Sequence, residues 1–308
     1  MSLFITGGTG LVGSAIRRIN PEVEFVSSED YDLREKEQVK KMFDKYKPKK
    51  MLHLAAKVGG LFENINNPAE LFYDNMLINT YVIHYAYKYG VEKMGTLICN
   101  CSYPDKSATY PMEESQLNLG SPNMTNYAYA MSKRATESQI KAYNFQYDKK
   151  FFCGIPCNVY GPNDQFDENK SHFVASLIKK IYDAKQNNAD FIELFGSGMP
   201  LRQYLYSEDL AKILLFLLDN YDQGTPINIA PTNHFSILDI TKKALCATRS
   251  NHLRIKLNTS YPDGQFRKDI SNLKLLTYMD NYKFTSLPDG ILKTYEWYSD
   301  KYIGESIE

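Results

Sequence analysis

Short apolar segments alternate with helical patterns along the first half of the chain. The apolar segments are residues 3–6, 24–28, 51–56, 96–99 and 151–156, and the helical patterns are residues 15–19, 39–46, 68–89 and 127–147. Strands that alternate with helices form βαβ units, in which helices cover both faces of a parallel sheet. The pattern therefore predicts an α/β protein with a Rossmann-like, doubly wound parallel sheet.

The regular alternation of strands and helices ends after Pro162. Longer polar loops, a basic helix near Lys179 and a short strand at residues 191–195 follow. A helical pattern at 207–219 and an apolar run at 227–230 are expected to return to the main sheet. We expect a Rossmann domain of residues 1–162 and about 202–233. Residues 163–201 and about 234–308 are expected to form a smaller C-terminal α/β substrate lobe.

The charge balance of the chain bears on its partners. Lys and Arg together number 36, as do Asp and Glu. A neutral chain lacks a long-range attraction to nucleic acid or to an anionic membrane. The first residues show no signal-peptide pattern, and no apolar run approaches the about 18 residues of a spanning helix. We therefore expect a cytoplasmic protein without nucleic-acid or membrane partners.

The first strand-to-helix junction carries the segment TGGTGLVGSAI, in which Gly8, Gly10 and Gly13 have the spacing G-x-G-x-x-G. Backbone approaches a pyrophosphate closely only where side chains are absent. The free N–H groups at the start of the following helix also attract its negative charge. The junction therefore predicts a dinucleotide-binding site.

The second predicted strand ends where the adenosine ribose of a dinucleotide would lie. An acidic residue there suits NAD, and a basic residue suits the phosphate of NADP. This chain has Ser27 and Ser28, whose hydroxyls suit a phosphate, followed by Glu29 and Asp30, which would repel one. These residues alone leave the choice of cofactor open.

Tyr129 and Lys133 lie four residues apart at the start of the predicted helix 127–147, so their side chains share one face. An adjacent ammonium group lowers the pKa of a phenol, which can then exchange a proton with a carbonyl or hydroxyl during hydride transfer. Two other tyrosine–lysine pairs have this spacing, but Pro48 interrupts one and the other passes a helix end at Gly90. Position therefore favours Tyr129 and Lys133.

Cys99 and Cys101 lie in the segment ICNCSYPDK, directly after a predicted strand. Five cysteines in a chain of this length do not indicate a disulfide framework. No metal site is expected, because neither this pair nor Cys153 with Cys157 has a usual zinc spacing. Cys153, Cys157 and Cys246 are expected to pack as small hydrophobic residues.

Segments along almost the whole chain carry a family resemblance, among them HLAAKVGG, CSYPDK, YAYAMSKR, NVYGPND, GSGMPLRQYLYSEDLA and PDGQFRK. The chain resembles the extended short-chain dehydrogenase/reductases and, within them, the GDP-L-fucose synthase family. The resemblance implies an NADPH-dependent 3,5-epimerase and 4-reductase that converts GDP-4-keto-6-deoxy-D-mannose to GDP-L-fucose. It also implies a homodimer joined through the helices at 68–89 and 127–147.

The resemblance also implies catalytic roles. The family's epimerase cysteine and histidine correspond to Cys101 and His172, as base and acid at carbons 3 and 5, which the 4-keto group acidifies. Tyr129, aided by Lys133, would then protonate the oxygen at carbon 4. Where the family usually has a serine that hydrogen-bonds this oxygen, the chain has Cys99, a poorer donor. Slower reduction than in a serine-bearing relative is therefore expected.

The resemblance places the binding residues in two groups. The GDP-sugar is expected to contact Lys180, Arg202 and Lys268. NADP(H) is expected to contact Gly7, Gly8, Thr9, Gly10, Leu11, Val12, Gly13, Ser27, Ser28, Ala55, Ala56, Lys133, Asn158 and His172.

Other functions on the same fold fit less well. A 4,6-dehydratase needs an acidic pair directly after position 99, where Asn100 and Cys101 stand, and a 4-epimerase has no use for a cysteine–histidine pair. A non-catalytic NADP-sensing protein commonly lacks the tyrosine or the lysine, and this chain has both.

Overall fold

The computed structural model describes residues 3–167, 171–261 and 263–305. Its centre is a six-stranded parallel sheet of order β10-β5-β4-β3-β1-β2. The strands are β1 Leu3–Thr6, β2 Glu24–Val26, β3 Lys50–His53, β4 Lys93–Leu97, β5 Phe152–Pro156 and β10 Ile227–Ile229. The predicted doubly wound α/β fold is confirmed, and the run at 227–230 does return to this sheet beside β5.

The strand order reverses at β1, because the chain first adds β2 on one side and then crosses to β3 on the other. Such a reversal opens a crevice at the carboxyl ends of the strands, where ligands bind in open α/β sheets. The central strands are apolar because both of their faces are covered. Phe4, Ile5, Met51 and Leu52 are almost completely buried.

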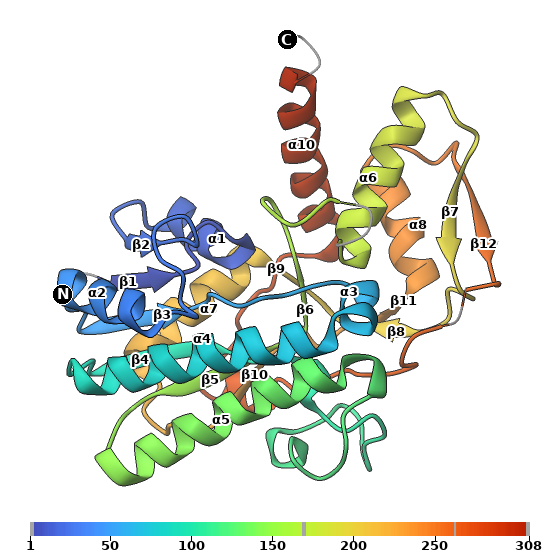
Figure 1. Ribbon diagram of the computed structural model, residues 1–308. Coiled ribbons are helices and arrows are strands. Elements are labelled where there is room, and N and C mark those ends of the chain that lie inside the picture. The colour runs from blue at the N-terminus through green and yellow to red at the C-terminus, as the bar shows by residue number, and fades with distance from the viewer. Residues whose placement is uncertain (1–2, 168–170, 262, 306–308) are drawn as a thin grey trace.

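Helices cover both faces of the sheet. One face carries α2 Lys36–Tyr46, α4 Pro68–Lys88 and α5 Tyr127–Tyr147, and α4 and α5 run side by side across it (Figure 1). The other face carries α1 Leu11–Ile19 and α7 Ser207–Asn220, which pack against each other. The short α3 Leu61–Asn66 precedes α4.

A second cluster of elements lies beside the sheet, on the right of Figure 1. It contains α6 Phe173–Gln186, β7 Phe191–Phe195, α8 Ile237–Ala247, β12 Arg254–Asn258 and α10 Leu287–Glu305. β7 and β12 pair in parallel, and α10 packs on α6 and α8. Ile178, Ile181, Ile240 and Ile291 are buried in a hydrophobic cluster of their own.

Short elements connect the two parts. β6 Asn158–Tyr160 pairs in parallel with β9 Tyr204–Tyr206, and β8 Leu201–Arg202 pairs antiparallel with β11 Phe235–Ser236. The segment between β4 and α5 contains the 3₁₀ turns η1 Asn100–Ser102, η2 Glu114–Gln116 and η3 Met124–Asn126, and α9 Leu273–Leu276 follows β12. Within the described ranges, no helix has the length and apolar composition to cross a bilayer.

Candidate active site

A cavity of about 990 Å³ lies at the carboxyl ends of the parallel strands. Its walls include Gly7 after β1, Ala55 after β3, Cys99 after β4 and Cys157 after β5. The second cluster contributes further walls, among them His172, which immediately precedes α6. The cavity therefore lies between the carboxyl edge of the sheet and the second cluster of elements.

The glycine-rich turn forms one end of the cavity. Gly7 has φ +77°, and a Cβ atom there would be 2.7 Å from the backbone nitrogen of Ala55. A Cβ atom on Gly13 would collide with the carbonyl oxygen of Gly7. Gly10 caps α1 without a side-chain hydrogen bond to its free N–H groups. The N–H groups of Gly7, Gly8 and Gly10 donate within the protein, so the N–H groups at the start of α1 are the ones available to a pyrophosphate.

Every predicted residue of this turn lines the cavity except Gly8: the lining residues are Gly7, Thr9, Gly10, Leu11, Val12 and Gly13. A Cβ atom on Gly8 would meet the ring of Phe25, so Gly8 serves the packing of the turn against β2. Ala55, Ala56 and Asn158 also line the cavity, as predicted for the cofactor site.

The segment after β2 contains two serines followed by two acidic residues, and only the serines line the cavity. Ser27 and Ser28 line the cavity, whereas Glu29 and Asp30 do not. The Asp30 carboxylate accepts hydrogen bonds from the backbone nitrogen of Ser27 (2.8 Å) and from its hydroxyl (3.0 Å). These bonds lower the pKa of Asp30. Glu29 and Asp30 therefore do not line the cavity, but Asp30 remains in direct contact with Ser27 in its wall.

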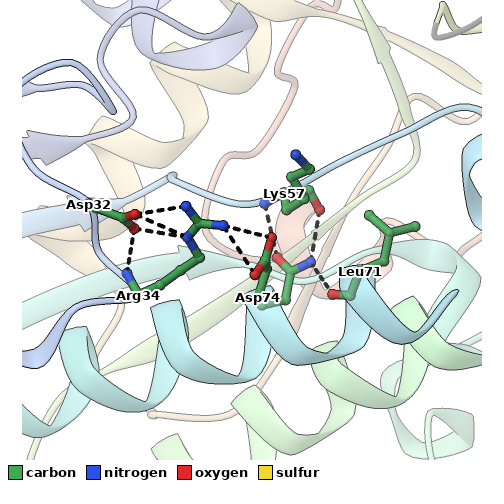
Figure 2. A network of polar contacts seen from close by, with 6 residues as sticks. Asp32, Arg34, Lys57, Leu71 and Asp74 are labelled. Atoms are coloured by element: carbon green, nitrogen blue, oxygen red, sulfur yellow. Dashed lines mark hydrogen bonds and ion pairs between the residues drawn. The ribbon is translucent and has the colours of Figure 1, made fainter. Parts of the chain in front are cut away.

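An ionic network forms part of the cavity wall beyond β2. The sequence did not indicate this network. Arg34 contacts Asp32 (Nη2 to Oδ2, 2.7 Å) and reaches Asp74 of α4 (Nη1 to Oδ2, 3.3 Å), as Figure 2 shows. Its two carboxylate partners raise the pKa of Arg34. Asn75, which follows Asp74 in α4, exchanges hydrogen bonds with the backbone of Lys57 at 2.8 and 3.1 Å. The network ties the loops after β2 and β3 to α4.

Tyr129 and Lys133 face the cavity from the first turns of α5. Lys133 Nζ donates to the carbonyl oxygen of Leu97 at 3.1 Å and lies 5.7 Å from the centre of the Tyr129 ring. Burial raises the pKa of Tyr129 and lowers the pKa of Lys133 to about 8. The expected lowering of the phenol pKa is wrong here, because burial raises the pKa of Tyr129.

Cys99 and Cys101 are joined by a disulfide, so the expectation of free thiols without a disulfide is wrong for this structure. The chain leaves β4 in an extended conformation at Cys99 and then turns through η1, which brings the two Cα atoms to 5.2 Å. Disulfides form over Cα separations of about 4.4–6.8 Å. Both cysteines line the cavity, as predicted.

His172 lines the cavity immediately before α6, and its side chain is exposed to the cavity. Burial, and then the charge of Lys268, lower the pKa of the imidazole. Lys268 also lines the cavity, and burial followed by the charge of Arg202 lowers its pKa to about 7. The lowered pKa favours the neutral imidazole, and His172 must be protonated before it acts as an acid.

The cations predicted for the GDP-sugar separate into two groups. Arg202 lines the cavity together with Lys268, and burial lowers the pKa of its guanidinium group. Lys180 does not line the cavity. Its Nζ donates to the carbonyl oxygen of Glu193 at 2.9 Å and lies 4.5 Å from the centre of the Phe195 ring, which does line it. The structure therefore brings together Arg202 and Lys268 but not Lys180.

Comparison with known proteins places this geometry in a family. Residues 3–230 match the NAD dependent epimerase/dehydratase family. The chain belongs to this family. It is 36% identical to the GDP-L-fucose synthase of Dictyostelium discoideum, over 98% of this chain and 96% of that protein. It is 38% identical to the GDP-L-fucose synthase of Sinorhizobium fredii, over 96% and 94% of the two chains.

A solved structure of similar sequence extends the comparison to the fold. The crystal structure of a GDP-L-fucose synthetase from Naegleria fowleri bound to NADP matches this member of the epimerase/dehydratase family with a TM-score of 0.89. The two chains are 34% identical, and the match covers 98% of this chain and 93% of that one. The resemblance found in the sequence motifs is thereby confirmed.

Two polar residues that the sequence did not single out also line the cavity of this epimerase/dehydratase family member. Asp164 Oδ2 and Ser171 Oγ are buried and make no hydrogen bond within the described residues. Burial raises the pKa of Asp164 to about 7. Asp164 is the aspartate of the NVYGPND segment. Its position shortly after Gly161 and Pro162 was the one feature of the sequence that could have marked it as a candidate site residue.

We expect Asp164→Asn to stabilise the fold at alkaline pH. A carboxyl whose pKa is raised by folding costs stability once the pH exceeds its unfolded pKa, and the cost is complete above its folded pKa. An unpartnered buried oxygen costs about 1–3 kcal/mol, and 1 kcal/mol shifts the Tm by about 2–4 °C. Thermal unfolding at pH 8 should therefore show a higher Tm for the variant, by several degrees.

The same measurement at lower pH supplies the control. The difference in Tm should shrink from pH 8 towards pH 4. The folded carboxyl is protonated below about pH 7, and the cost of that protonation falls as the pH approaches the unfolded pKa of 3.8. Asp167→Asn, which changes an exposed carboxyl of the same loop, provides a matched variant. A Tm difference for Asp164→Asn that is independent of pH would contradict this account.

Proposed function

We propose that this chain is a GDP-L-fucose synthase that converts GDP-4-keto-6-deoxy-D-mannose to GDP-L-fucose with NADPH. One observation carries the proposal: a single cavity is lined by the glycine-rich turn, by Tyr129 with Lys133, and by Cys101 with His172. Near full-length similarity to GDP-L-fucose synthases supports it. The proposed lobes are residues 1–162 with about 202–233, and 163–201 with about 234–308.

The residues at the sheet end of the cavity fit a dinucleotide phosphate. The turn around Gly7 and Gly13 leaves no room for side chains. Ser27 and Ser28 line the cavity where a ribose phosphate would lie, and the Ser27 hydroxyl donates to Asp30. NADPH, when bound, supplies a hydride to carbon 4 of the sugar. The similar Naegleria fowleri structure is bound to NADP.

Epimerisation requires two proton-transfer groups on opposite faces of the sugar. The 4-keto group stabilises the carbanion formed when a proton leaves carbon 3 or carbon 5. In the reduced protein the Cys101 thiolate removes that proton, and a protonated His172 returns one to the other face. The second carbon is inverted in the same way.

Reduction requires a proton donor at the carbon 4 oxygen. The raised pKa of Tyr129 keeps its phenol protonated, which suits a group that gives a proton as the hydride arrives. Lys133 lies behind it on the next turn of α5, and its ammonium group stabilises the phenolate that remains. Cys99 occupies the wall beside them.

We expect GDP binding to draw a proton into the site. Lys268 has a pKa of about 7, so about half of it is neutral at pH 7. A diphosphate beside Lys268 and Arg202 favours the charged form and raises this pKa. Calorimetry in buffers of different ionisation enthalpy should therefore show an uptake of up to about half a proton at pH 7 and of more at pH 8.

A matched variant isolates Lys268 in this experiment. His172 and Asp164 also have shifted pKa values at the cavity and contribute to the total. Lys268→Met should remove the Lys268 share, whereas Lys274→Met, a half-buried lysine outside the cavity lining, should not. Equal proton uptake by wild type and Lys268→Met would show that the diphosphate is bound elsewhere.

We expect Cys99→Ser to raise the rate of reduction in protein kept under dithiothreitol. A serine hydroxyl donates a stronger hydrogen bond to the carbon 4 oxygen than a thiol does. A gain of about 1 kcal/mol in the transition state corresponds to about fivefold in turnover. Stopped-flow measurement of NADPH oxidation tests this. Unchanged or lower turnover would refute it.

The proposed assembly is a cytoplasmic homodimer joined through α4 and α5. These helices lie side by side on the outside of the sheet (Figure 1). Tyr73 on α4 is 63% exposed and Phe145 on α5 is 93% exposed, which supports a covered apolar surface. A second copy of the chain would bury both.

A direct assay tests the proposed function. The reduced protein, given GDP-4-keto-6-deoxy-D-mannose and NADPH, should consume NADPH and yield GDP-L-fucose, identified by NMR. UDP-4-keto-6-deoxy-D-glucose is the control, because its nucleotide differs while its ketone is available for reduction. No NADPH consumption with the GDP-sugar, or a product of D configuration only, would refute the proposal.

A further inference from the structure

The disulfide between Cys99 and Cys101 lies in the wall of the cavity that Tyr129 and His172 also line. Both cysteines are half-buried, so the cavity gives small molecules access to the sulfur atoms. Ser102 Oγ lies 3.3 Å from Cys99 Sγ, and its hydroxyl can donate to that sulfur. The bond therefore occupies the reacting end of the site.

The disulfide is incompatible with the chemistry assigned to these residues. A sulfur atom within a disulfide carries no proton and is not a thiolate base. Cys101 then cannot take a proton from carbon 3 or carbon 5, and Cys99 cannot donate to the carbon 4 oxygen. The glycine-rich turn that would hold the dinucleotide contains neither residue.

Resting on the function proposed above, we propose that Cys99 and Cys101 form a reversible redox modification site that stops turnover when oxidised and permits it when reduced. The other cysteines offer no such pair. Cys153 and Cys157 are buried, and burial raises the pKa of both thiols. Cys246 is exposed on α8 and does not line the cavity.

The oxidant in this step is a small-molecule disulfide such as oxidised glutathione. The Cys101 thiolate attacks one of its sulfurs, which forms a mixed disulfide and releases one glutathione thiolate. The Cys99 thiolate then attacks the Cys101 sulfur, forms the Cys99–Cys101 bond and releases the second glutathione thiolate. Two protein thiols thus lose two electrons and two protons, and one glutathione disulfide becomes two glutathione thiols.

This stoichiometry gives a sharp test on the intact protein. The protein is equilibrated in glutathione buffers, its thiols are alkylated, and the bonded Cys99–Cys101 pair is measured by peptide mass spectrometry. Because closing the pair releases two thiols for each disulfide consumed, tenfold dilution of total glutathione at a constant disulfide-to-thiol ratio should raise the bonded-to-reduced ratio about tenfold. Deuterium exchange at carbons 3 and 5 and NADPH consumption should both decrease as the disulfide-bonded fraction increases.

Dithiothreitol should restore deuterium exchange and NADPH consumption. NADPH binding, measured by fluorescence, should be equal in the reduced and the disulfide-bonded protein. Cys99→Ser can form only a mixed disulfide at Cys101, whose ratio to thiol is unchanged by dilution. Cys246→Ser should behave as wild type. A pair that stays reduced in every buffer, or an oxidised protein with full exchange, would overturn the proposal.

Failure of the proposed function gives a different result. A fully reduced protein that catalyses neither exchange nor NADPH consumption would contradict the proposed function and the catalytic effect of the switch. The dilution dependence of the bonded pair would still decide whether the modification site exists, because that measurement uses no sugar.

Discussion

Cys101→Ser is expected to lose proton exchange at carbons 3 and 5 of GDP-4-keto-6-deoxy-D-mannose, by about 10²–10⁴-fold, while much of the NADPH consumption remains. A serine hydroxyl has too high a pKa to serve as the base at neutral pH, but the Tyr129 phenol that serves reduction is unchanged. The product should then be a 6-deoxy sugar of D configuration. Exchange is measured by NMR in deuterated water, and reduction by NADPH absorbance.

The control for this prediction is Cys246→Ser, which removes an exposed thiol outside the cavity lining and should retain both activities. Equal losses of exchange and reduction in Cys101→Ser would count against separate roles for Cys101 and Tyr129. They would indicate that Cys101 shapes the cavity rather than moving a proton.

Tyr129→Phe is expected to give the opposite result to Cys101→Ser, with reduction lost and proton exchange retained. Without its hydroxyl no proton reaches the carbon 4 oxygen, so reduction should fall by about 10²–10⁴-fold. Exchange at carbons 3 and 5 should persist, because Cys101 and His172 do not need the phenol. Single-turnover NADPH oxidation and deuterium exchange, measured on one preparation, test both parts.

Tyr127→Phe is the matched control. Tyr127 begins the same helix but is exposed and does not line the cavity. This variant should keep both activities. If Tyr129→Phe lost exchange as completely as reduction, the phenol would have to take part in epimerisation, and the division of labour proposed here would be wrong.

The architecture of the sheet could be predicted because its segments differ in period and composition. Short apolar runs such as residues 3–6 and 151–156 are buried on both faces, whereas α5 has the longer helical pattern. The helices α8 and α10 of the second cluster could not be predicted as separate elements, because that part of the sequence lacks the regular strand–helix alternation. Their packing against α6 depends on contacts distant in sequence.

The chemistry of the site was less accessible from the sequence. Which cysteines lie close enough to join depends on the turn η1, and a spacing of two residues does not reveal it. The raised pKa of Tyr129 results from burial, which the spacing of Tyr129 and Lys133 does not reveal. Likewise, Lys180 contacts the ring of Phe195 in the cavity wall but does not itself line the cavity. The importance of Asp164 depends on its buried, unpartnered oxygen, which the sequence does not show.

The central claim is that a cysteine and a histidine exchange protons with the same ketose that the tyrosine helps to reduce. The most direct measurement is the mass and NMR spectrum of the product formed by the reduced wild-type protein with NADPH in deuterated water. Our account predicts GDP-L-fucose with one deuterium on carbon 3 and one on carbon 5. A reduced product without deuterium on either carbon would contradict it.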